Sequence, residues 1–288
     1  MIHHVVRRKP YELKLLKHML NRGLLSLEEQ RKLNRLQTGF KGEEMVDAFL
    51  KETWLTGVYY PDLILSVNGQ TIQIDAVVCM KNDLYVFEIK NYSGQFTCFN
   101  EEWRLSGGQL IANPLTQLNR MTTIFRQFLQ ESGWTHLKVH AFAVFPNPDF
   151  TLFGAEMNDP IIVRSQFSLL TERMRKNQSM PSKQLLKHFD QQQIPTSSHS
   201  LQLPELKNKS IKTGLFCSQC NGHIIEVSQR NLRCAACGQI ESKKEGAKRL
   251  IQEIRMLAPH LKITGGLLNQ WSGGMISERQ GYRYVHSR

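Results

Sequence analysis

Three charged side chains interrupt two apolar stretches of the sequence that otherwise have the composition of buried strands. Asp75 lies in the first stretch, residues 72–79, and Glu88 and Lys90 lie in the second, residues 84–91. Ionisable groups are rarely placed in core strands unless they are paired, hydrated or bound to a metal ion. Two carboxylates could hold magnesium. An adjacent ammonium could orient the attacking water or stabilise the negative charge that develops in phosphodiester hydrolysis. The alternative is a solvated strand face, on which Glu-x-Lys is common.

The turn between the two stretches decides which charged side chains face one another. The four intervening residues, Met-Lys-Asn-Asp, are typical of a β-hairpin because Asn and Asp tolerate the dihedral angles of tight turns. A four-residue loop sets Asp75 opposite Glu88, whereas a two-residue loop sets it opposite Lys90. In either register strict strand alternation places all three side chains on one face. Opposed Cβ atoms are about 5 Å apart, close enough for two carboxylates to share one divalent cation.

The order of Asp75 and the sequence Glu88-Ile89-Lys90 resembles the Asp…(Asp/Glu)-x-Lys motif of the restriction-endonuclease-like nuclease superfamily. Within it, four segments between residues 39 and 117 resemble the nuclease-related domain (NERD) family: GFKGEEMVDAFL, IDAVV, YVFEIKNYSG and NPLTQ. The resemblance implies a restriction-endonuclease-like α/β core. It also implies a catalytic magnesium or manganese ion held by Asp75 and Glu88, with Lys90 orienting or deprotonating the attacking water.

The same resemblance adds two site residues that the spacing alone does not single out. In the family, the Gly-Glu of the first segment contributes an active-site glutamate, which is Glu43 here, with Glu44 as the alternative. An acidic residue in the first turn of a helix also has a sufficient structural reason, because it complements the helix dipole. The Gln of the Asn-Pro-x-x-Gln segment helps to position the scissile group in the family, which implies this role for Gln117.

A second metal site is indicated by two Cys-x2-Cys pairs separated by 13 residues, close to the spacing of four-thiolate zinc sites. Turn residues follow each pair, and the segment resembles a zinc ribbon. Four thiolates leave no open position for water, so the zinc would be structural and would supply most of the folding free energy of a small core. The predicted ligands are Cys217, Cys220, Cys234 and Cys237.

The charge of the chain indicates a polyanionic partner. The net charge is +12, and residues 205–288 contain 14 Lys or Arg and 6 Asp or Glu, so this part alone carries +8. Nucleic acid is the commonest such partner, and we expect DNA rather than RNA. The alternative is a solvated basic surface without a partner. Nothing in the sequence addresses the oligomeric state.

The basic C-terminal residues follow a helical pattern. An amphipathic helix is predicted at residues 243–257, followed by a short helix at 267–271 and another from about Ser277. The last two resemble a degenerate helix-turn-helix, whose second helix would present Arg279, Gln280 and Arg283 to nucleic acid. The alternative is a helical hairpin that only caps the ribbon.

The elements that must position these residues follow from periodicity and from end signals. Ser26-Leu-Glu-Glu29 is a capping box that starts one helix, residues 39–52 form another, and Asn113-Pro114 starts a third. Strand patterns occur at 59–67, 72–79, 84–91, 95–99, 103–106, 139–145 and 161–163. Their order suits a mixed sheet with helices on both faces.

We therefore expect five segments, with the first packed on the second: an N-terminal helical extension (1–38), a nuclease-related domain (39–190), a linker (191–212), a zinc ribbon (213–242) and a basic helical tail (243–288). No apolar run approaches the roughly 20 residues of a membrane span, and the N-terminus lacks the apolar stretch of a signal peptide, so we expect a cytoplasmic protein. The expected function is metal-dependent cleavage of DNA or RNA. The alternative is a nucleic-acid-binding or regulatory protein that keeps the nuclease fold without cleavage.

Overall fold

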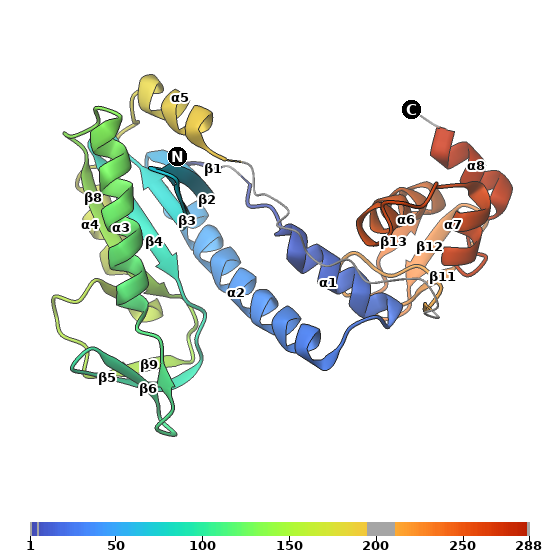
Figure 1. Cartoon of the computed structure of the whole chain (residues 1–288), viewed down its shortest axis with the longest axis horizontal. Helices are drawn as coiled ribbons and strands as arrows, with labels where there is room; N and C mark the ends of the chain where they lie inside the picture. Colours follow the sequence, from blue (N-terminus) through green and yellow to red (C-terminus); the bar gives the residue numbers. More distant parts are fainter. Residues whose placement is uncertain (1, 5, 195–210, 287–288) are drawn as a thin grey trace. The chain divides into compact units, whose positions relative to one another are not determined.

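The computed structural model describes residues 2–4, 6–194 and 211–286, and they form two compact units (Figure 1). The described parts of residues 1–9 and 36–197 form the first unit, and those of residues 10–35 and 198–288 form the second. Most of the predicted linker, residues 195–210, lies outside the described residues. None of the described helices is both long enough and apolar enough to cross a membrane.

The first unit is built on a six-stranded mixed sheet, which confirms the predicted α/β fold class. The strand order is β1-β2-β3-β4-β8-β10. Strands β2, β3 and β4 are antiparallel neighbours, whereas β1 pairs parallel with β2 and β8 pairs parallel with both β4 and β10. The strands are β1 (Ile2–His4), β2 (Gly57–Val67), β3 (Gln70–Cys79), β4 (Asp83–Ile89), β8 (Lys138–Phe145) and β10 (Ile161–Val163).

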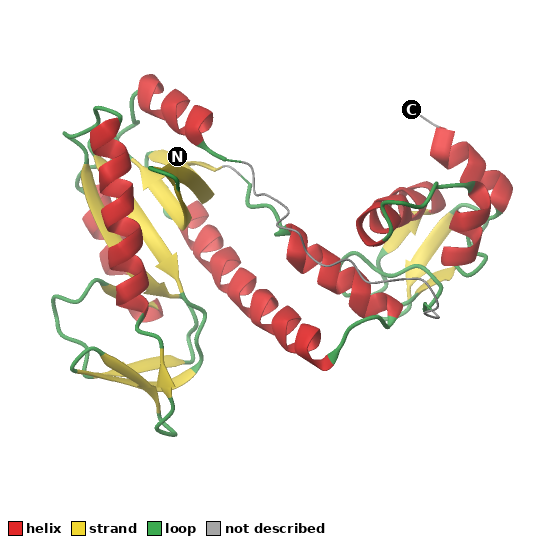
Figure 2. Ribbon diagram, in the orientation of Figure 1, coloured by secondary structure: helices red, strands yellow, loops and turns green. Residues whose placement is uncertain are grey.

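Helices cover both faces of this sheet (Figure 2). Apolar residues of α3 (Pro114–Glu131) and α5 (Lys183–Gln192) belong to the core on one face, where Phe125 and Phe189 are fully buried. Residues of α2 (Leu27–Glu52) and α4 (Phe167–Arg175) belong to the core on the other face, where Leu50 and Met174 are buried. A 3-10 turn, η1 (Arg164–Gln166), precedes α4.

A smaller four-stranded sheet contains the strands predicted at 95–99 and 103–106. Its order is β7-β6-β5-β9, with β5 antiparallel to β6 and parallel to β9. Trp103 of β6 is buried and stacks on Phe145 of the main sheet, as expected for a packing anchor. The strands are β5 (Gly94–Phe99), β6 (Glu102–Leu105), β7 (Leu110–Ile111) and β9 (Phe150–Phe153).

One continuous helix, α2, replaces the two that the sequence predicts on either side of Gly39. Ser26 and Glu29 form the predicted capping box: the Oγ of Ser26 accepts from the N–H of Glu29, and Glu29 accepts from the N–H of Ser26. The prediction of a second start at Gly39 was wrong because glycine in a helix interior costs only about 1 kcal/mol and does not break the hydrogen-bond ladder.

The second unit contains helix α1 (Tyr11–Arg22), a three-stranded ribbon and three further helices. The ribbon order is β11-β12-β13, with antiparallel pairs throughout. The predicted basic helix begins at a capping box between Ser242 and Glu245. These elements are β11 (Ile224–Glu226), β12 (Asn231–Cys234), β13 (Ile240–Ser242), α6 (Lys243–Leu257), α7 (Gly265–Trp271) and α8 (Glu278–His286).

Helix α1 belongs to this second unit, whereas we expected from the sequence that it packs on the segment 39–190. Arg22, at its end, is fully buried, and its Nε lies 2.7 Å from Oε1 of Glu253 on α6. The guanidinium also lies 5.1 Å from the ring centroid of Phe216 and 4.9 Å from that of Trp271. A buried ion pair with two cation–π contacts requires these partners together, which explains why α1 packs beside the ribbon.

Candidate active site and metal centre

Strands β3 and β4 form the predicted hairpin with its four-residue loop. Cys79 pairs with Leu84, and continuation of this register sets Asp75 opposite Glu88, the first of the two predicted arrangements. The ladder between the strands ends one residue before that position. In its place, the N–H of Ile89 donates to Oδ2 of Asp75 over 2.7 Å. The Asp75 carboxylate is therefore fixed at the end of β4.

Lys90 links the second predicted carboxylate to helix α3. Its Nζ lies 2.7 Å from Oε1 of Glu88, which is 2% exposed, and donates to Oε1 of Gln117 over 2.9 Å. Gln117 is in the first turn of α3, which begins as predicted with Asn113 as N-cap and Pro114 at its first position. The structure thus brings together the predicted residues Glu88, Lys90 and Gln117.

The alternation of side chains along β2 and β3 is interrupted at Asp62 and Asp75. On the face covered by α3, β3 contributes Ile74 before the interruption and Val77 after it. The residues of β3 that face α3 are therefore even-numbered before Asp75 and odd-numbered after it. Residues on both sides of Asp62 and Asp75 are paired between β2 and β3, but these two residues are not paired with each other. The backbone of Asp62 is also unusual, with a φ of 51°. The strict alternation from which a shared face was predicted therefore does not hold at Asp75.

Glu43 reaches this region because Gly42 lets helix α2 approach the chain just after β4. A Cβ at Gly42 would lie 2.5 Å from the Cβ of Asn91, a separation that real Cβ atoms do not show. The Nδ2 of Asn91 donates to the carbonyl of Thr38 over 2.7 Å and holds the helix at this distance. Glu43 is partly buried, whereas Glu44, the alternative residue, is exposed. The glycine therefore has a packing reason that also places the glutamate.

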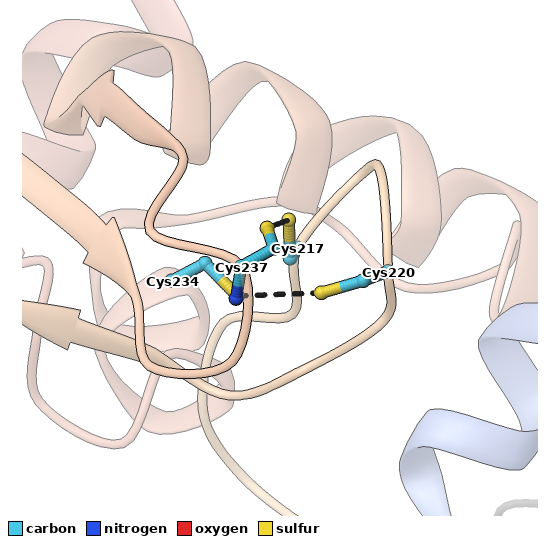
Figure 3. Close-up of side chains that lie close together, drawn as sticks. All are labelled: Cys217, Cys220, Cys234 and Cys237. Carbon is cyan, nitrogen blue, oxygen red and sulfur yellow. Dashed lines mark hydrogen bonds between the residues drawn. The ribbon is translucent and has the colours of Figure 1, made fainter.

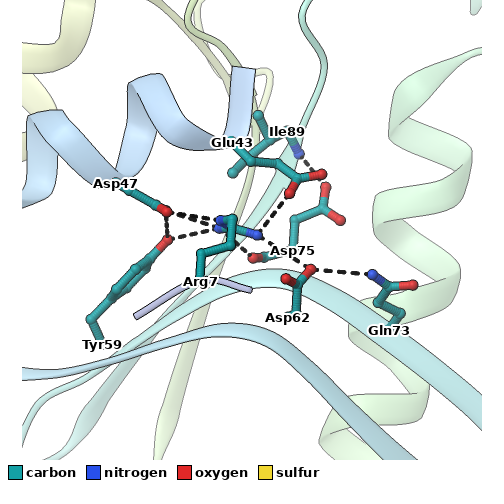
Figure 4. A network of polar contacts seen from close by, with 8 residues as sticks. All are labelled: Arg7, Glu43, Asp47, Tyr59, Asp62, Gln73, Asp75 and Ile89. Carbon is teal, nitrogen blue, oxygen red and sulfur yellow. Dashed lines mark hydrogen bonds and ion pairs between the residues drawn. The ribbon is translucent and has the colours of Figure 1, made fainter. Parts of the chain in front are cut away.

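Arg7 is a residue of this region that the sequence did not predict. Its side chain is 3% exposed, and its guanidinium lies among acidic groups of α2 and β2 (Figure 4). The i+4 spacing of Glu43 and Asp47 on α2 could have indicated two carboxylates on one helix face. No local signal identifies Arg7, because its partners lie at least 36 residues away. They are Glu43, Asp47, Tyr59, Asp62 and the carbonyl of Asp75.

Burial raises the pKa of two carboxyl groups of this region, those of Asp75 and Glu43. It raises the pKa of Asp75 to about 8, with a further contribution from the charge of Glu88 and an opposing one from the Ile89 N–H. It raises the pKa of Glu43 to about 7, against the effect of Arg7. Burial lowers the pKa of Lys90, but Glu88 outweighs it, so the pKa lies above its usual value and the ammonium is charged. An added divalent cation would favour the carboxylate forms.

The four predicted cysteines gather at one point of the ribbon (Figure 3). Their sulfur atoms all lie within 4.8 Å of one another, with 3.7 Å between Cys217 and Cys237 and 3.4 Å between Cys220 and Cys234. Thiolates around a tetrahedral zinc with bonds of about 2.3 Å would be about 3.8 Å apart. The cluster is therefore compatible with structural zinc.

The backbone around the cysteines supports the same conclusion. The N–H groups of Gln219, Gly222 and Cys237 point at cysteine sulfur atoms over 3.4, 3.4 and 3.5 Å. Such bonds favour thiolates, and the one from Cys237 contributes most to lowering the pKa of Cys234 to about 6. A Cβ at Gly222 would lie 2.8 Å from the Cβ of Ala236. Glycine is thus needed where the two cysteine turns meet.

Helices α7 and α8 form a close helical pair. A Cβ at Gly265 would lie 2.3 Å from the carbonyl oxygen of Glu278, and a Cβ at Gly281 would lie 2.9 Å from the Cα of Gly265. The two helices therefore approach through glycine, and larger side chains there would separate them. This geometry fits either a helical hairpin or a helix-turn-helix, so the role of the pair in reading DNA stays a prediction.

The three predicted nucleic-acid-binding residues of α8 differ in their surroundings. Gln280 caps the helix: its Oε1 accepts from the N–H of Ser277 over 3.1 Å, and Ser277 Oγ accepts from the N–H of Gln280 over 3.3 Å. Arg279 and Arg283 are both exposed. Only Arg283 of these two lines a cavity of ≈ 800 Å³ between the ribbon and the tail. The two exposed arginines therefore differ in that Arg283 lines the cavity and Arg279 does not.

That cavity has a cationic lining. Its charged residues include Arg230, Lys244 and Arg283, which are exposed, and Lys243, which is buried. The acidic residue in the lining, Glu226, lies 2.8 Å from Nζ of Lys243. One of the four cations is therefore neutralised, and the remaining three give the cavity a net positive charge that suits phosphate groups.

Comparison with known proteins finds a family match in the middle of the chain. Residues 38–146 match the family model described as nuclease-related domain, and this range includes Glu43, Asp75, Glu88, Lys90 and Gln117. No curated protein and no solved structure gave a significant match. The chain thus contains a nuclease-related domain, which indicates a nuclease-related function, while Arg7 and the cysteine ribbon lie outside the matched range.

Proposed function

We propose that this chain is a metal-dependent nuclease that hydrolyses phosphodiester bonds in DNA or, as the less favoured substrate, RNA. The observation that carries the proposal is the arrangement at the end of β4 within the nuclease-related domain. There the buried Glu88 is paired with Lys90, Lys90 contacts Gln117, and the Asp75 carboxylate is fixed by the N–H of Ile89. Carboxylates can hold a metal ion that activates water, and an ammonium and an amide can stabilise developing charge and position the scissile group.

The donor set at this position suits magnesium or manganese. Carboxylate oxygens are the ligands these ions prefer, and magnesium commonly uses one or two carboxylates and completes its shell with water and substrate phosphate oxygens. Among the described residues, the four cysteines are the only group of three or more His, Cys, Asp or Glu that could hold a metal ion. We assign the magnesium or manganese to the pair of Asp75 and Glu88, with water and substrate supplying further oxygen ligands.

The protein groups would divide the chemistry between them. Magnesium, when bound, would supply charge stabilisation and a more acidic water. Lys90 is charged and in contact with Glu88, so it would orient the attacking water or stabilise the charge that develops on phosphorus. Gln117, held by Lys90, would position the scissile group, and Glu43 would assist from α2.

The second unit would hold nucleic acid while the first unit cuts it. The cavity of ≈ 800 Å³ lined by Arg230, Lys244 and Arg283 offers cations to backbone phosphates. The zinc ribbon would act here as a support, because zinc binding fixes the strands that carry part of this lining.

A non-cleaving nucleic-acid-binding or regulatory protein is the second candidate function. The buried guanidinium of Arg7 favours it, since Arg7 already neutralises Glu43 over 2.9 Å and so satisfies part of the acidic cluster without a metal ion. The clustered Asp75, Glu88 and Lys90 favour cleavage, because a binding scaffold has no need of buried charge at this position.

Incubation of the purified chain with labelled DNA and RNA, in magnesium, manganese or chelator, separates the two functions. We expect metal-dependent cutting that Asp75→Ala abolishes and that Glu44→Ala leaves unchanged, because Glu44 is exposed. Binding of either nucleic acid without cleavage in any metal would support the second candidate instead.

A further inference from the structure

The N-terminal strand carries Arg7 to the acidic side of the first unit. Strand β1 pairs parallel with the start of β2, with Ile2 beside Gly57 and His4 beside Tyr59. Three residues later the side chain of Arg7 enters the space between α2 and β2, where it is 3% exposed. An arginine is rarely buried to this extent unless all its donors find acceptors.

Each nitrogen of the guanidinium has a defined partner (Figure 4). Nε donates to one carboxylate oxygen of Asp47 over 2.8 Å, and Nη2 donates to the other over 2.9 Å. Nη1 donates to Oε2 of Glu43 over 2.9 Å and lies 3.2 Å from Oδ1 of Asp62. The planar fork therefore binds Asp47 through two parallel bonds and holds two further carboxylates, an arrangement that lysine cannot reproduce.

The same group also fixes the main chain beside the predicted metal ligands. Nη2 donates to the carbonyl oxygen of Asp75 over 3.0 Å and to the hydroxyl of Tyr59 over 2.9 Å. This carbonyl lies where the β2–β3 register is interrupted, so Arg7 supplies a hydrogen-bond donor to the main chain at that point. One side chain thus holds Glu43 on α2 and the backbone of Asp75 on β3.

We propose that Arg7 is a positioning residue of the candidate nuclease site. It sets the separation of α2 and β3, and with it the placement of Glu43 and the direction in which the Asp75 carboxylate points. The inference rests on the proposed function, yet it concerns a residue outside the matched family segment, residues 38–146. It makes Arg7, which follows β1 in the chain, part of the site.

The test compares Arg7→Met and Arg7→Lys with Arg8→Met, a matched change of the exposed neighbouring arginine. Arg7→Met should lower the single-turnover cleavage rate roughly 10- to 100-fold while the KM for DNA stays within about twofold, because a small misplacement of catalytic groups acts on the chemical step. Arg7→Lys should restore part of the rate, and Arg8→Met should match the wild type.

A second readout separates this inference from the proposed function. Titration with manganese, followed by paramagnetic resonance of the free ion, should show weaker binding in Arg7→Met than in Arg8→Met whether or not the wild type cleaves nucleic acid. Absence of cleavage with intact manganese binding would refute the proposed function alone. Equal manganese affinity in the two variants, or no manganese binding by the wild type, would overturn the positioning role.

If Arg7→Met does not fold, Asp47→Asn and Tyr59→Phe provide milder changes. Each removes or weakens one partner of Arg7 and leaves the side chains of Glu43 and Asp75 in the sequence. The two should lower cleavage and manganese affinity in the same direction, with Asp47→Asn the larger effect because it loses a bidentate charged pair. Wild-type values in both variants would also overturn the inference.

Discussion

Asp75 and Ile89 are joined by a hydrogen bond between a side chain and the backbone, at the point where the ladder of β3 and β4 ends. The N–H of Ile89 donates to Oδ2 of Asp75 over 2.7 Å. In a regular ladder this N–H would donate to a carbonyl of the neighbouring strand, so the carboxylate takes the place of a backbone acceptor. The hydrogen bond thereby fixes the Asp75 carboxylate at the end of β4, beside the residue that follows Glu88 in the sequence of that strand. The first predictions concern the residues of this candidate site.

Loss of either proposed magnesium ligand should abolish cleavage and leave the fold intact. Asp75→Ala and Glu88→Ala should each lower the single-turnover rate by at least about 100-fold, since removal of one electrostatic group at a reacting centre has this effect. Nucleic-acid affinity, measured by fluorescence anisotropy, should stay near that of the wild type. A fall in affinity in parallel with the rate would place these residues in binding.

Lys90→Ala should lose activity but keep metal affinity, because the ammonium would act on water and phosphate and is not a ligand. Magnesium should still raise the unfolding temperature of Lys90→Ala, whereas Asp75→Ala should lose most of this protection. Differential scanning fluorimetry with and without magnesium measures both. Loss of the magnesium effect in Lys90→Ala would contradict the assigned division of roles.

The stability of the first unit without metal should depend on pH through Asp75. Burial raises its folded-state pKa to about 8 from an ordinary value of 3.8, so the folded state binds the proton more tightly than the unfolded state. The stability from this group is complete below about pH 4 and is lost as the pH rises through about 8. Urea unfolding in chelator should show this decline in the wild type, and Asp75→Asn should show less of it.

The cysteine cluster predicts one zinc ion per chain. Cys217→Ser or Cys234→Ser should lose the zinc together with the order of the ribbon, because metal binding supplies most of the folding free energy of so small a core. Cys98→Ser, which changes a thiol in the first unit, is the matched control and should keep one zinc. Elemental analysis of protein purified without chelator measures the ratio, and a wild type without zinc would refute the assignment.

The cavity beside the ribbon predicts which arginine of α8 binds nucleic acid. Arg283→Ala and Arg230→Ala should weaken DNA binding and reduce the slope of log K against log salt by about 0.9 for each phosphate that the variant no longer neutralises. Arg279→Ala, on the same helix but outside the cavity lining, should have a smaller effect. Equal effects of Arg279 and Arg283 would favour the predicted helix-turn-helix over the cavity as the binding surface.

Local sequence signals determined much of the first unit and the metal centre. The Asn113-Pro114 start of α3, the Ser26 capping box and the presence of a hairpin turn between residues 79 and 84 all depend on residues a few positions apart, and the structure shows each of them. The spacing of the cysteine pairs likewise suffices to indicate a four-sulfur cluster. These features could be predicted because neighbouring residues alone decide their geometry.

Interactions between distant residues decided the rest. Arg7 meets acceptors as far away as Asp75, and Arg22 meets Glu253 across 231 positions, so neither partner can be identified from the local sequence. The interruption of alternation at Asp62 and Asp75 also needs two strands at once, because each strand deviates where the other does. A charged side chain can be buried without a large energetic cost only when its hydrogen-bond donors are paired with acceptors. Only the folded chain brings those groups together.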